Sequence, residues 1–293
     1  MSDYSKKPSF KETGLKSAIT EFALALTALK GEYFYPSGTA VVIASCLAMT
    51  AKHVIEDYWS NFEQENLGNN SEGSFSIMAI QVLNNGESGT LWNVTKIWLC
   101  DTTDIAFLFL TPASDNAKDI KLKYPRINLV PPGVGTRITG FGYPKSEVII
   151  EKVKEKDVYV LWKDSPSTTI GEVIEVFDQK RDSYLLSFPC FRVNARFDHG
   201  MSGGPIFNDN GELCGIISCS SSMPEEDFHD SYVASLWPAM ATQIDINRDG
   251  FEPSLSYPVI ELAKNGLIHA KNWEKVKINR DEFGKVTSVS LQP

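Results

Sequence analysis

A serine enclosed by glycines is the strongest chemical signal in the sequence. The segment Gly200-Met-Ser-Gly-Gly-Pro205 lets the backbone approach a substrate closely and adopt dihedral angles that are closed to other residues. A turn of this kind can direct the backbone N–H groups of Gly200 and Ser202 at one point, as an oxyanion hole requires. A glycine-rich surface turn with an incidental serine is the alternative, because short motifs also occur by chance.

A histidine lies at the end of a strand-like segment. His53, in Thr50-Ala-Lys-His53-Val54, directly follows a buried strand and precedes a segment that is expected to form a polar loop. An imidazole titrates near pH 6.5 and can therefore serve as a general base. Taken alone, such a histidine is more often structural.

An aspartate opens the apolar run that ends at Leu110. Asp104 can hold the second imidazole nitrogen of the histidine and so fix its tautomer. Capping of the strand or simple solvent exposure is the ordinary role of such a residue. Asp101 is the nearby rival, and Asp104 is preferred because it adjoins the apolar run directly.

The elements that would position these residues are mostly short strands, with turn signals between them. Many short strands at near-regular spacing indicate an all-β barrel or sandwich. The strands fall into two segments, 31–112 and 129–240, separated by a linker at 113–128 that lacks the pattern. The expected strands are 39–44, 46–50, 75–83, 91–100, 105–110, 137–141, 147–151, 158–162, 171–176, 184–193, 205–207, 212–218 and 231–234.

The two ends of the chain are expected to be additions to this β-rich body. Residues 1–30 read as a tail and an amphipathic helix, because Ile19, Phe22, Leu26 and Leu29 recur at helical spacing. Glu21 interrupts the apolar stretch and no small-residue cleavage pattern follows, which argues against a signal peptide. Residues 241–293 form a C-terminal extension with one helical run at 258–266.

The composition excludes several classes of protein. The 293 residues include 28 Lys plus Arg and 37 Asp plus Glu, a net charge of −9, which argues against a nucleic-acid partner. A hydrophobic fraction of 42% supports a sizeable core and excludes wholesale disorder. The longest nearly apolar run, 39–51, is shorter than the about 20 residues that span a bilayer, so no membrane span is expected.

The histidines and cysteines show no paired spacing of a metal site, and no glycine-rich phosphate loop is present. We therefore expect neither a metal nor a cofactor. Five cysteines in a chain of this length favour reduced thiols over a disulfide framework, and hence a reducing, cytoplasmic location. They are Cys46, Cys100, Cys190, Cys214 and Cys219.

Together the three motifs resemble those of the trypsin-like (chymotrypsin-fold) serine peptidases, over roughly residues 33–240. Thr50-Ala-Lys-His53, Asp104-Ile-Ala and Gly200-x-Ser202-Gly-Gly-Pro205 occur in the family's order of His, Asp and Ser. The segment Gly140-Phe-Gly-Tyr-Pro144 also resembles one that is common in bacterial members. The resemblance implies two packed antiparallel six-stranded β-barrels, at 31–112 and 129–240, which share a cleft.

The resemblance also implies a serine endopeptidase that acts on protein or peptide substrates through an acyl-enzyme. Ser202 would be the nucleophile, His53 the general base and Asp104 its orienting partner, with the amides of Gly200 and Ser202 as the oxyanion hole. The chain from Ser218 through Cys219 to Ser220 would offer backbone to an extended substrate. A narrow range of protein substrates is expected. The alternative is a catalytically silent or latent module that binds a partner protein or peptide.

Several positions depart from the family pattern. Met201 stands where digestive trypsins carry the aspartate that pairs with a new N-terminus, so activation by that route is not expected. The two terminal regions are then the candidate regulators. A simple trypsin register places Arg196 at the pocket floor, which would favour an acidic substrate side chain. His199 either touches that side chain or is an exposed loop histidine, and Ser220, where trypsins carry Gly, would narrow the entrance.

Overall fold

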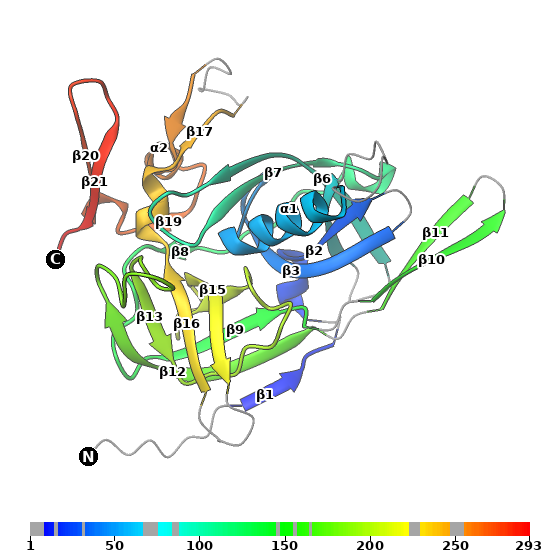
Figure 1. Cartoon of the computed structure of the whole chain (residues 1–293), viewed down its shortest axis with the longest axis horizontal. Coiled ribbons are helices and arrows are strands. Elements are labelled where there is room, and N and C mark those ends of the chain that lie inside the picture. The colour runs from blue at the N-terminus through cyan, green and yellow to red at the C-terminus, as the bar shows by residue number, and fades with distance from the viewer. Residues whose placement is uncertain are drawn as a thin grey trace.

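Short apolar strands close into two barrels that lie side by side (Figure 1). The structure is a computed structural model. It describes residues 9–14, 17–30, 33–66, 76–83, 88–144, 147–154, 157–163, 166–222, 229–246 and 255–293.

The first barrel closes in the strand order β2-β3-β4-β7-β6-β5. All of its pairings are antiparallel, and β2 pairs with both β3 and β5 to complete the ring. Closure leaves no strand edge open to unwanted pairing. The strands are β2 (Ala23–Lys30), β3 (Tyr33–Ala44), β4 (Leu47–Thr50), β5 (Ser76–Leu83), β6 (Ser88–Leu99) and β7 (Ala106–Pro112).

The second barrel closes in the order β14-β9-β12-β13-β16-β15, and β15 pairs back onto β14. Its strands are β9 (Arg137–Gly142), β12 (Ser167–Phe177), β13 (Cys190–Val193), β14 (Pro205–Phe207), β15 (Leu213–Ser222) and β16 (His229–Ser235). The structure therefore confirms the expected fold class, an all-β architecture of two antiparallel six-stranded barrels.

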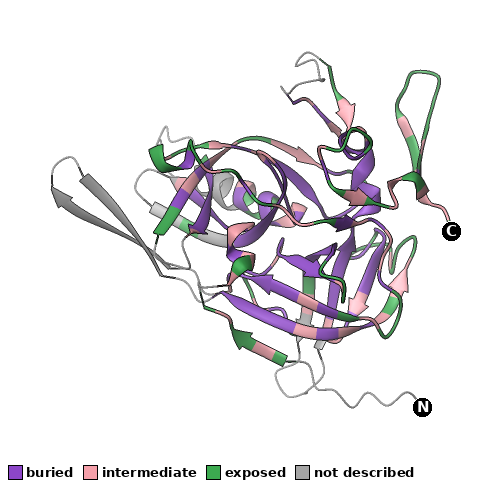
Figure 2. Ribbon diagram, turned by 180° about the vertical axis from the view of Figure 1, so that it is seen from behind, coloured by how far each residue is buried: buried purple, intermediate pink, exposed green. Residues whose placement is uncertain are grey.

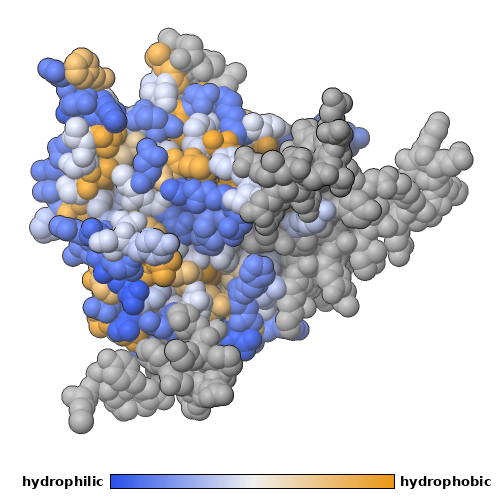
Figure 3. All heavy atoms as spheres, in the orientation of Figure 1, coloured by the Kyte–Doolittle hydropathy of each residue, from blue (hydrophilic) through white to orange (hydrophobic). Residues whose placement is uncertain are grey.

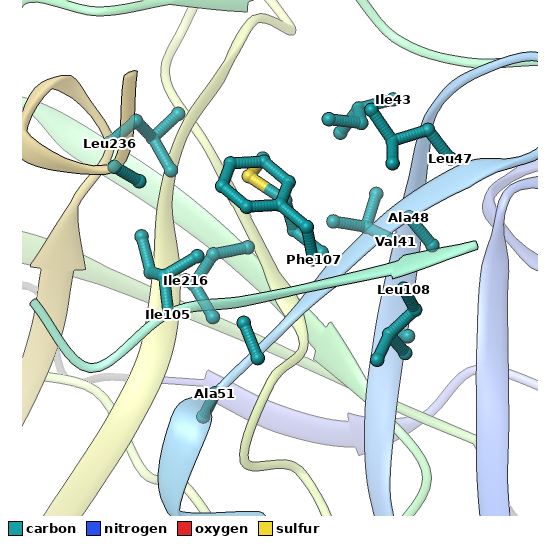
Figure 4. Packing of buried hydrophobic residues seen from close by; sticks show 14 of the residues in the cluster. Val41, Ile43, Leu47, Ala48, Ala51, Ile105, Phe107, Leu108, Ile216 and Leu236 are labelled. Atoms are coloured by element: carbon teal, nitrogen blue, oxygen red, sulfur yellow. The ribbon is translucent and has the colours of Figure 1, made fainter. Parts of the chain in front are cut away.

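The second barrel has a hydrophobic cluster of its own, and another cluster contains residues of both barrels. The cluster includes Val41 of β3, Phe107 of β7 and Ile216 of β15, each fully buried. Figure 4 shows the ring of Phe107 between Val41 on one side and Ile105 and Ile216 on the other. Figure 2 shows buried residues throughout the strands of both barrels. Burial of this kind, at roughly 25 cal/mol per Å² of apolar surface, is the main force that holds the two barrels together.

The segment after His53 is a helix, so the expectation of a polar loop there was wrong. Helix α1 (Lys52–Asn66) begins immediately after the buried Ala51. Val54, Ile55 and Tyr58 lie on one face at helical spacing and are buried. The helix thus sits on the first barrel and presents His53 in its first turn (Figure 1).

The amphipathic helix expected near the N-terminus was also wrong. Only a 3-10 turn forms, at Ala18–Glu21, and strand β2 follows it. Residues 23–28 are all buried, because one side of β2 faces the barrel interior and the other is covered. A strand buried on both faces is a continuous apolar run, which periodicity alone does not separate from a helix. The first barrel therefore begins at Ala23, earlier than expected.

The expected linker and one expected strand were partly wrong. Residues 113–128 contain a 3-10 turn at Asp115–Ala117 and strand β8 (Ile127–Asn128), which pairs in parallel with β15 of the second sheet.

Strand β13 covers only the last residues of the expected 184–193 strand, because the preceding residues form a loop in which Asp182 accepts three backbone hydrogen bonds.

The C-terminal extension packs against the barrels. Helix α2 (Val259–Lys264) confirms the expected helical run, and β19 (Ala270–Lys271) pairs in parallel with β8. The remaining elements are the pairs β10 (Glu147–Lys154) with β11 (Asp157–Lys163), β17 (Gln243–Ile244) with β18 (Tyr257–Pro258), β20 (Val276–Arg280) with β21 (Val286–Leu291), β1 (Ser9–Glu12) on β12, and the 3-10 turns Trp237–Ala241 and Trp273–Lys275.

All five cysteines are free thiols. Cys100, Cys190 and Cys214 are buried, and burial raises the pKa of the Cys100 and Cys190 thiols to about 12. Among the described residues, no helix is both long and apolar enough to cross a bilayer. On the described part of the face in Figure 3, hydrophobic residues lie in small groups among hydrophilic ones.

Leu24 distinguishes strand β2 from the helix that its sequence suggests. In a helix, Leu24 would lie opposite the apolar face of Ile19 and Leu26, whereas in β2 it is fully buried. We expect Leu24→Ala to lower the free energy of unfolding by about 2–5 kcal/mol in urea titrations. Leu255→Ala, at a side chain that is 49% exposed, should change it by no more than about 0.5 kcal/mol. Equal, small effects of both substitutions would contradict the strand.

Candidate active site

His53 and Asp104 are held together by two hydrogen bonds. The Nδ1 atom of His53 lies 2.8 Å from Oδ2 of Asp104, and the backbone N–H of His53 donates to Oδ1 over 3.0 Å. That N–H belongs to the first turn of α1, where backbone donors lack helical partners and a negative charge is favoured. The carboxylate therefore fixes both the ring and the start of the helix. Asp104, and not its rival Asp101, occupies this position.

The surroundings of His53 raise the pKa of its imidazole above the ordinary value of 6.5. Burial is the largest single influence, and it lowers the pKa because it disfavours the charged ring. The hydrogen bond to Asp104 and the charge of that carboxylate act in the opposite direction, with smaller help from Asp57 and Glu56, and together they prevail. His53 thus binds a proton more readily than a free histidine does.

A third donor reaches Asp104 from the other barrel. Ser218 of β15 donates its hydroxyl hydrogen to Oδ2 over 2.5 Å. Asp104 is only 8% exposed and Ser218 only 3%. A buried carboxylate is tolerated when such hydrogen bonds replace water. This contact ties the His53 side of the site to the strand that borders Ser202.

Two glycines give the loop around Ser202 its shape. Gly200 and Gly203 have φ angles of +90° and +84°, which other residues rarely adopt. A Cβ at Gly203 would lie 2.1 Å from both the Thr39 carbonyl oxygen and the Thr50 hydroxyl, and one at Gly200 would lie 2.6 Å from the Tyr143 carbonyl oxygen. The loop therefore packs directly on backbone, which only glycine allows.

The amides of this loop alternate in their bonding. Those of Met201, Gly203 and Gly204 donate to backbone carbonyls. Within the described part of the chain, the amides of Gly200 and Ser202 have no hydrogen-bond partner. These are the two amides that sequence analysis selected. Ser202 lines a cavity, whereas Gly200 is buried behind it and is not part of the lining. Unpaired N–H groups at such a place can donate hydrogen bonds to a negatively charged oxygen.

The Ser202 hydroxyl donates to the carbonyl oxygen of Ser218 over 3.3 Å, and not to His53. Ser202 and His53 nevertheless line the same cavity of about 440 Å³. Rotation of the serine about its Cα–Cβ bond moves the hydroxyl between staggered positions at little cost. Hydrogen bonds between nucleophile and base are commonly long or absent until a substrate is bound.

Four of the five expected substrate-binding residues line the cavity beside Ser202. His199 lies on its rim, and the residues Ser218, Cys219 and Ser220 form one wall. A second cavity of about 650 Å³ shares His53, Ser218, Cys219 and Ser220 with the first, and extends to the loop that carries Tyr184 and Leu185. A chain lying along β15 would pass both cavities.

Arg196 does not line the cavity, so the expected basic floor does not fit the structure. Its guanidinium binds both carboxylate oxygens of Asp198, at 2.7 and 2.8 Å, and stacks on the ring of Phe10. The buried Phe197 borders the cavity instead. The ion pair with Asp198 holds the Arg196 side chain at the surface, where it is 48% exposed.

Sequence analysis missed the residues that support the loop from the first barrel. Thr39 and Thr50 are fully buried and hydrogen-bond to each other, the hydroxyl of Thr50 donating to the carbonyl of Thr39 over 2.7 Å. The available signal was a threonine that opens the otherwise apolar run 39–44. Met201, where trypsins carry aspartate, is fully buried in the core of the second barrel.

Comparison with known proteins assigns the chain to a family. The model of the trypsin-like peptidase domain family matches residues 38–216, and the chain belongs to this family. No curated protein matches it. Among solved structures, it is similar to Rv3671c from M. tuberculosis H37Rv, solved as an inactive serine-to-alanine mutant. The two share 14% identity at a TM-score of 0.44, over 75% of this chain and 84% of that chain, a likeness too low to add to the argument.

Replacement of Asp104 tests the origin of the raised His53 pKa. In Ser202→Ala protein, NMR titration should place the His53 midpoint above 6.5. Asp104→Asn should bring the midpoint below that value, because burial then prevails. Asp101→Asn, a neighbouring aspartate without contact to His53, should leave it raised. A midpoint unaffected by Asp104→Asn would contradict the assignment.

The same pair sets a pH dependence of stability. Folding raises the pKa of His53. The contribution of the His53–Asp104 pair to the free energy of unfolding is therefore fully present below the ordinary pKa of 6.5, and it is lost as the pH rises through the raised value. The stability difference between the wild type and the Asp104→Asn protein should therefore shrink over that window.

Proposed function

We propose that the chain is a serine endopeptidase that hydrolyses peptide bonds through His53, Asp104 and Ser202. The observation that carries the proposal is the contact of Asp104 with both His53 and Ser218, since the Ser218 carbonyl in turn holds the Ser202 hydroxyl. Membership of the trypsin-like peptidase family supports the same reaction class.

In the first step, the Ser202 hydroxyl turns from Ser218 towards Nε2 of His53. Oγ attacks the substrate carbonyl carbon while His53 takes the hydroxyl proton. Asp104 holds Nδ1–H and stabilises the imidazolium that forms. The raised pKa of His53 favours this protonated state, and it also means that activity should rise with pH through that pKa.

The tetrahedral intermediate carries its negative oxygen between the amides of Gly200 and Ser202. It collapses to an acyl-enzyme as the C–N bond breaks and His53 gives its proton to the leaving amine. Water then attacks the acyl carbon with His53 again as base, releasing the carboxylate product and restoring Ser202. Loss of one oxyanion donor typically costs about 10²–10³ in rate.

Substrate binding in this proposal uses backbone pairing along Ser218, Cys219 and Ser220, with side chains entering the two cavities. His199 would contact the residue at the scissile bond. Two cavities that both include His53 support selection of substrate side chains at more than one position, and hence a narrow range of protein substrates. The free thiols support a reducing compartment such as the cytoplasm.

A catalytically silent or latent module that binds a protein or peptide is the second candidate. One observation favours it, namely that the Ser202 hydroxyl donates to Ser218 and not to His53. In this alternative, the cavities and the strand β15 bind a partner without cleaving it. The reactivity of Ser202 separates the two candidates.

A fluorophosphonate probe tests the proposal without knowledge of the substrate. The Ser202 Oγ should displace fluoride from phosphorus, with His53 accepting the proton, and the label should appear on Ser202 in mass spectra. Ser202→Ala should abolish labelling, while Ser288→Ala, at an exposed serine of β21, should label as the wild type does. Wild-type protein that stays unlabelled would support the silent module instead.

A further inference from the structure

A buried threonine on the first barrel, Thr39, packs against the loop of Ser202. Resting on the proposed function, we infer that the hydroxyl of Thr39 is a positioning group that holds the oxyanion-binding amide of Gly200 in place. Thr39 touches no substrate in this proposal, and it acts only through the Gly200 peptide.

Every polar group of Thr39 is engaged. Its hydroxyl donates to the Gly200 carbonyl over 2.9 Å and accepts the Tyr143 amide over 3.1 Å. Its own amide donates to the Ser202 carbonyl over 2.9 Å, and its carbonyl accepts the Thr50 hydroxyl. Thr39 is fully buried. One residue of β3 thus holds the loop of the second barrel on both sides of Met201.

The Gly200 carbonyl is the critical contact. A glycine has few steric barriers to rotation, so the peptides on either side of Gly200 would be free to turn. The bond from the Thr39 hydroxyl fixes the carbonyl that follows Gly200, at a φ of +90°. The N–H of Gly200 belongs to the preceding peptide, and it has no partner within the described part of the chain. The backbone angles of Gly200 set its direction relative to the held carbonyl, so a carbonyl that turned would carry the N–H out of place.

The Tyr143 amide makes the hydroxyl group of Thr39 hard to replace. The hydroxyl donates to the Gly200 carbonyl and at the same time accepts a hydrogen bond from the amide of Tyr143, which directly follows β9. Serine keeps a hydroxyl that can both donate and accept these hydrogen bonds. Valine keeps the shape of the side chain and can do neither. Buried partners left without hydrogen bonds are unfavourable, so the Gly200 carbonyl would turn to find another donor.

The rate constant of fluorophosphonate inactivation, kinact, is the measurement that tests this role, with the inhibition constant KI determined alongside. The phosphoryl oxygen needs the same amides as a substrate oxyanion. We expect Thr39→Val to lower kinact about tenfold to a hundredfold with KI nearly unchanged, because a misplacement of about 1 Å can cost about 10²-fold in rate. Thr39→Ser should restore most of the rate.

The pH profile of kinact should keep its midpoint in Thr39→Val, because the contacts of His53 and Asp104 remain. Thr27→Val is the matched control. Thr27 is buried in the same barrel, and among the described residues its hydroxyl reaches only the neighbouring Ala28 carbonyl, at 3.4 Å. Its kinact should equal that of the wild type. Because kinact comes from the time course, a smaller folded fraction lowers the amplitude and not the rate constant.

If Thr39→Val does not fold, a comparison of kinact between Thr39→Ser and Thr39→Ala tests the role of the hydroxyl. Both substitutions remove the methyl group, and only serine retains the hydroxyl. A kinact equal in serine and alanine, or wild-type kinact in Thr39→Val with only a lower melting temperature, would overturn the inference and leave the proposed function intact. Wild-type protein that does not react at all would overturn both.

Discussion

The close packing of a glycine-rich loop of one barrel against the backbone of the other is the constraint on which the site depends. Gly203 lies where any Cβ would meet the Thr39 carbonyl and the Thr50 hydroxyl at 2.1 Å. The loop can therefore sit only where glycine permits, and hydrogen bonds from Thr39 hold it there. The two barrels share a core as well, so neither the loop nor its support can shift without disturbing buried apolar contacts.

A buried carboxylate makes the second connection between the barrels. Asp104 accepts hydrogen bonds from His53 of the first barrel and from Ser218 of the second. Its charge holds the pKa of His53 above the ordinary value although burial acts against it. The same strand that supplies Ser218 supplies the carbonyl on which the Ser202 hydroxyl rests. Electrostatics and strand geometry thus bring the three residues to one place.

The sequence alone was enough to select the candidate residues whose signals lie in their immediate neighbours. The serine among glycines, and the histidine and aspartate beside apolar strands, carry signals that do not depend on distant contacts. Strand β2 was misread because burial on both faces removes the alternation that marks a strand. Helix α1 was misread because its polar residues outweigh the apolar face of Val54, Ile55 and Tyr58. The direction of Arg196 depends on Asp198 and Phe10, and Phe10 belongs to a strand far away in the chain.

The most direct test of the account is a crystal structure of the fluorophosphonate adduct. The account predicts phosphorus on Ser202 Oγ, with the phosphoryl oxygen about 2.7–3.1 Å from the amides of Gly200 and Ser202. The Thr39 hydroxyl should still be bonded to the Gly200 carbonyl. An adduct on another residue, or a phosphoryl oxygen in solvent with the Gly200 amide turned away from it, would contradict the account.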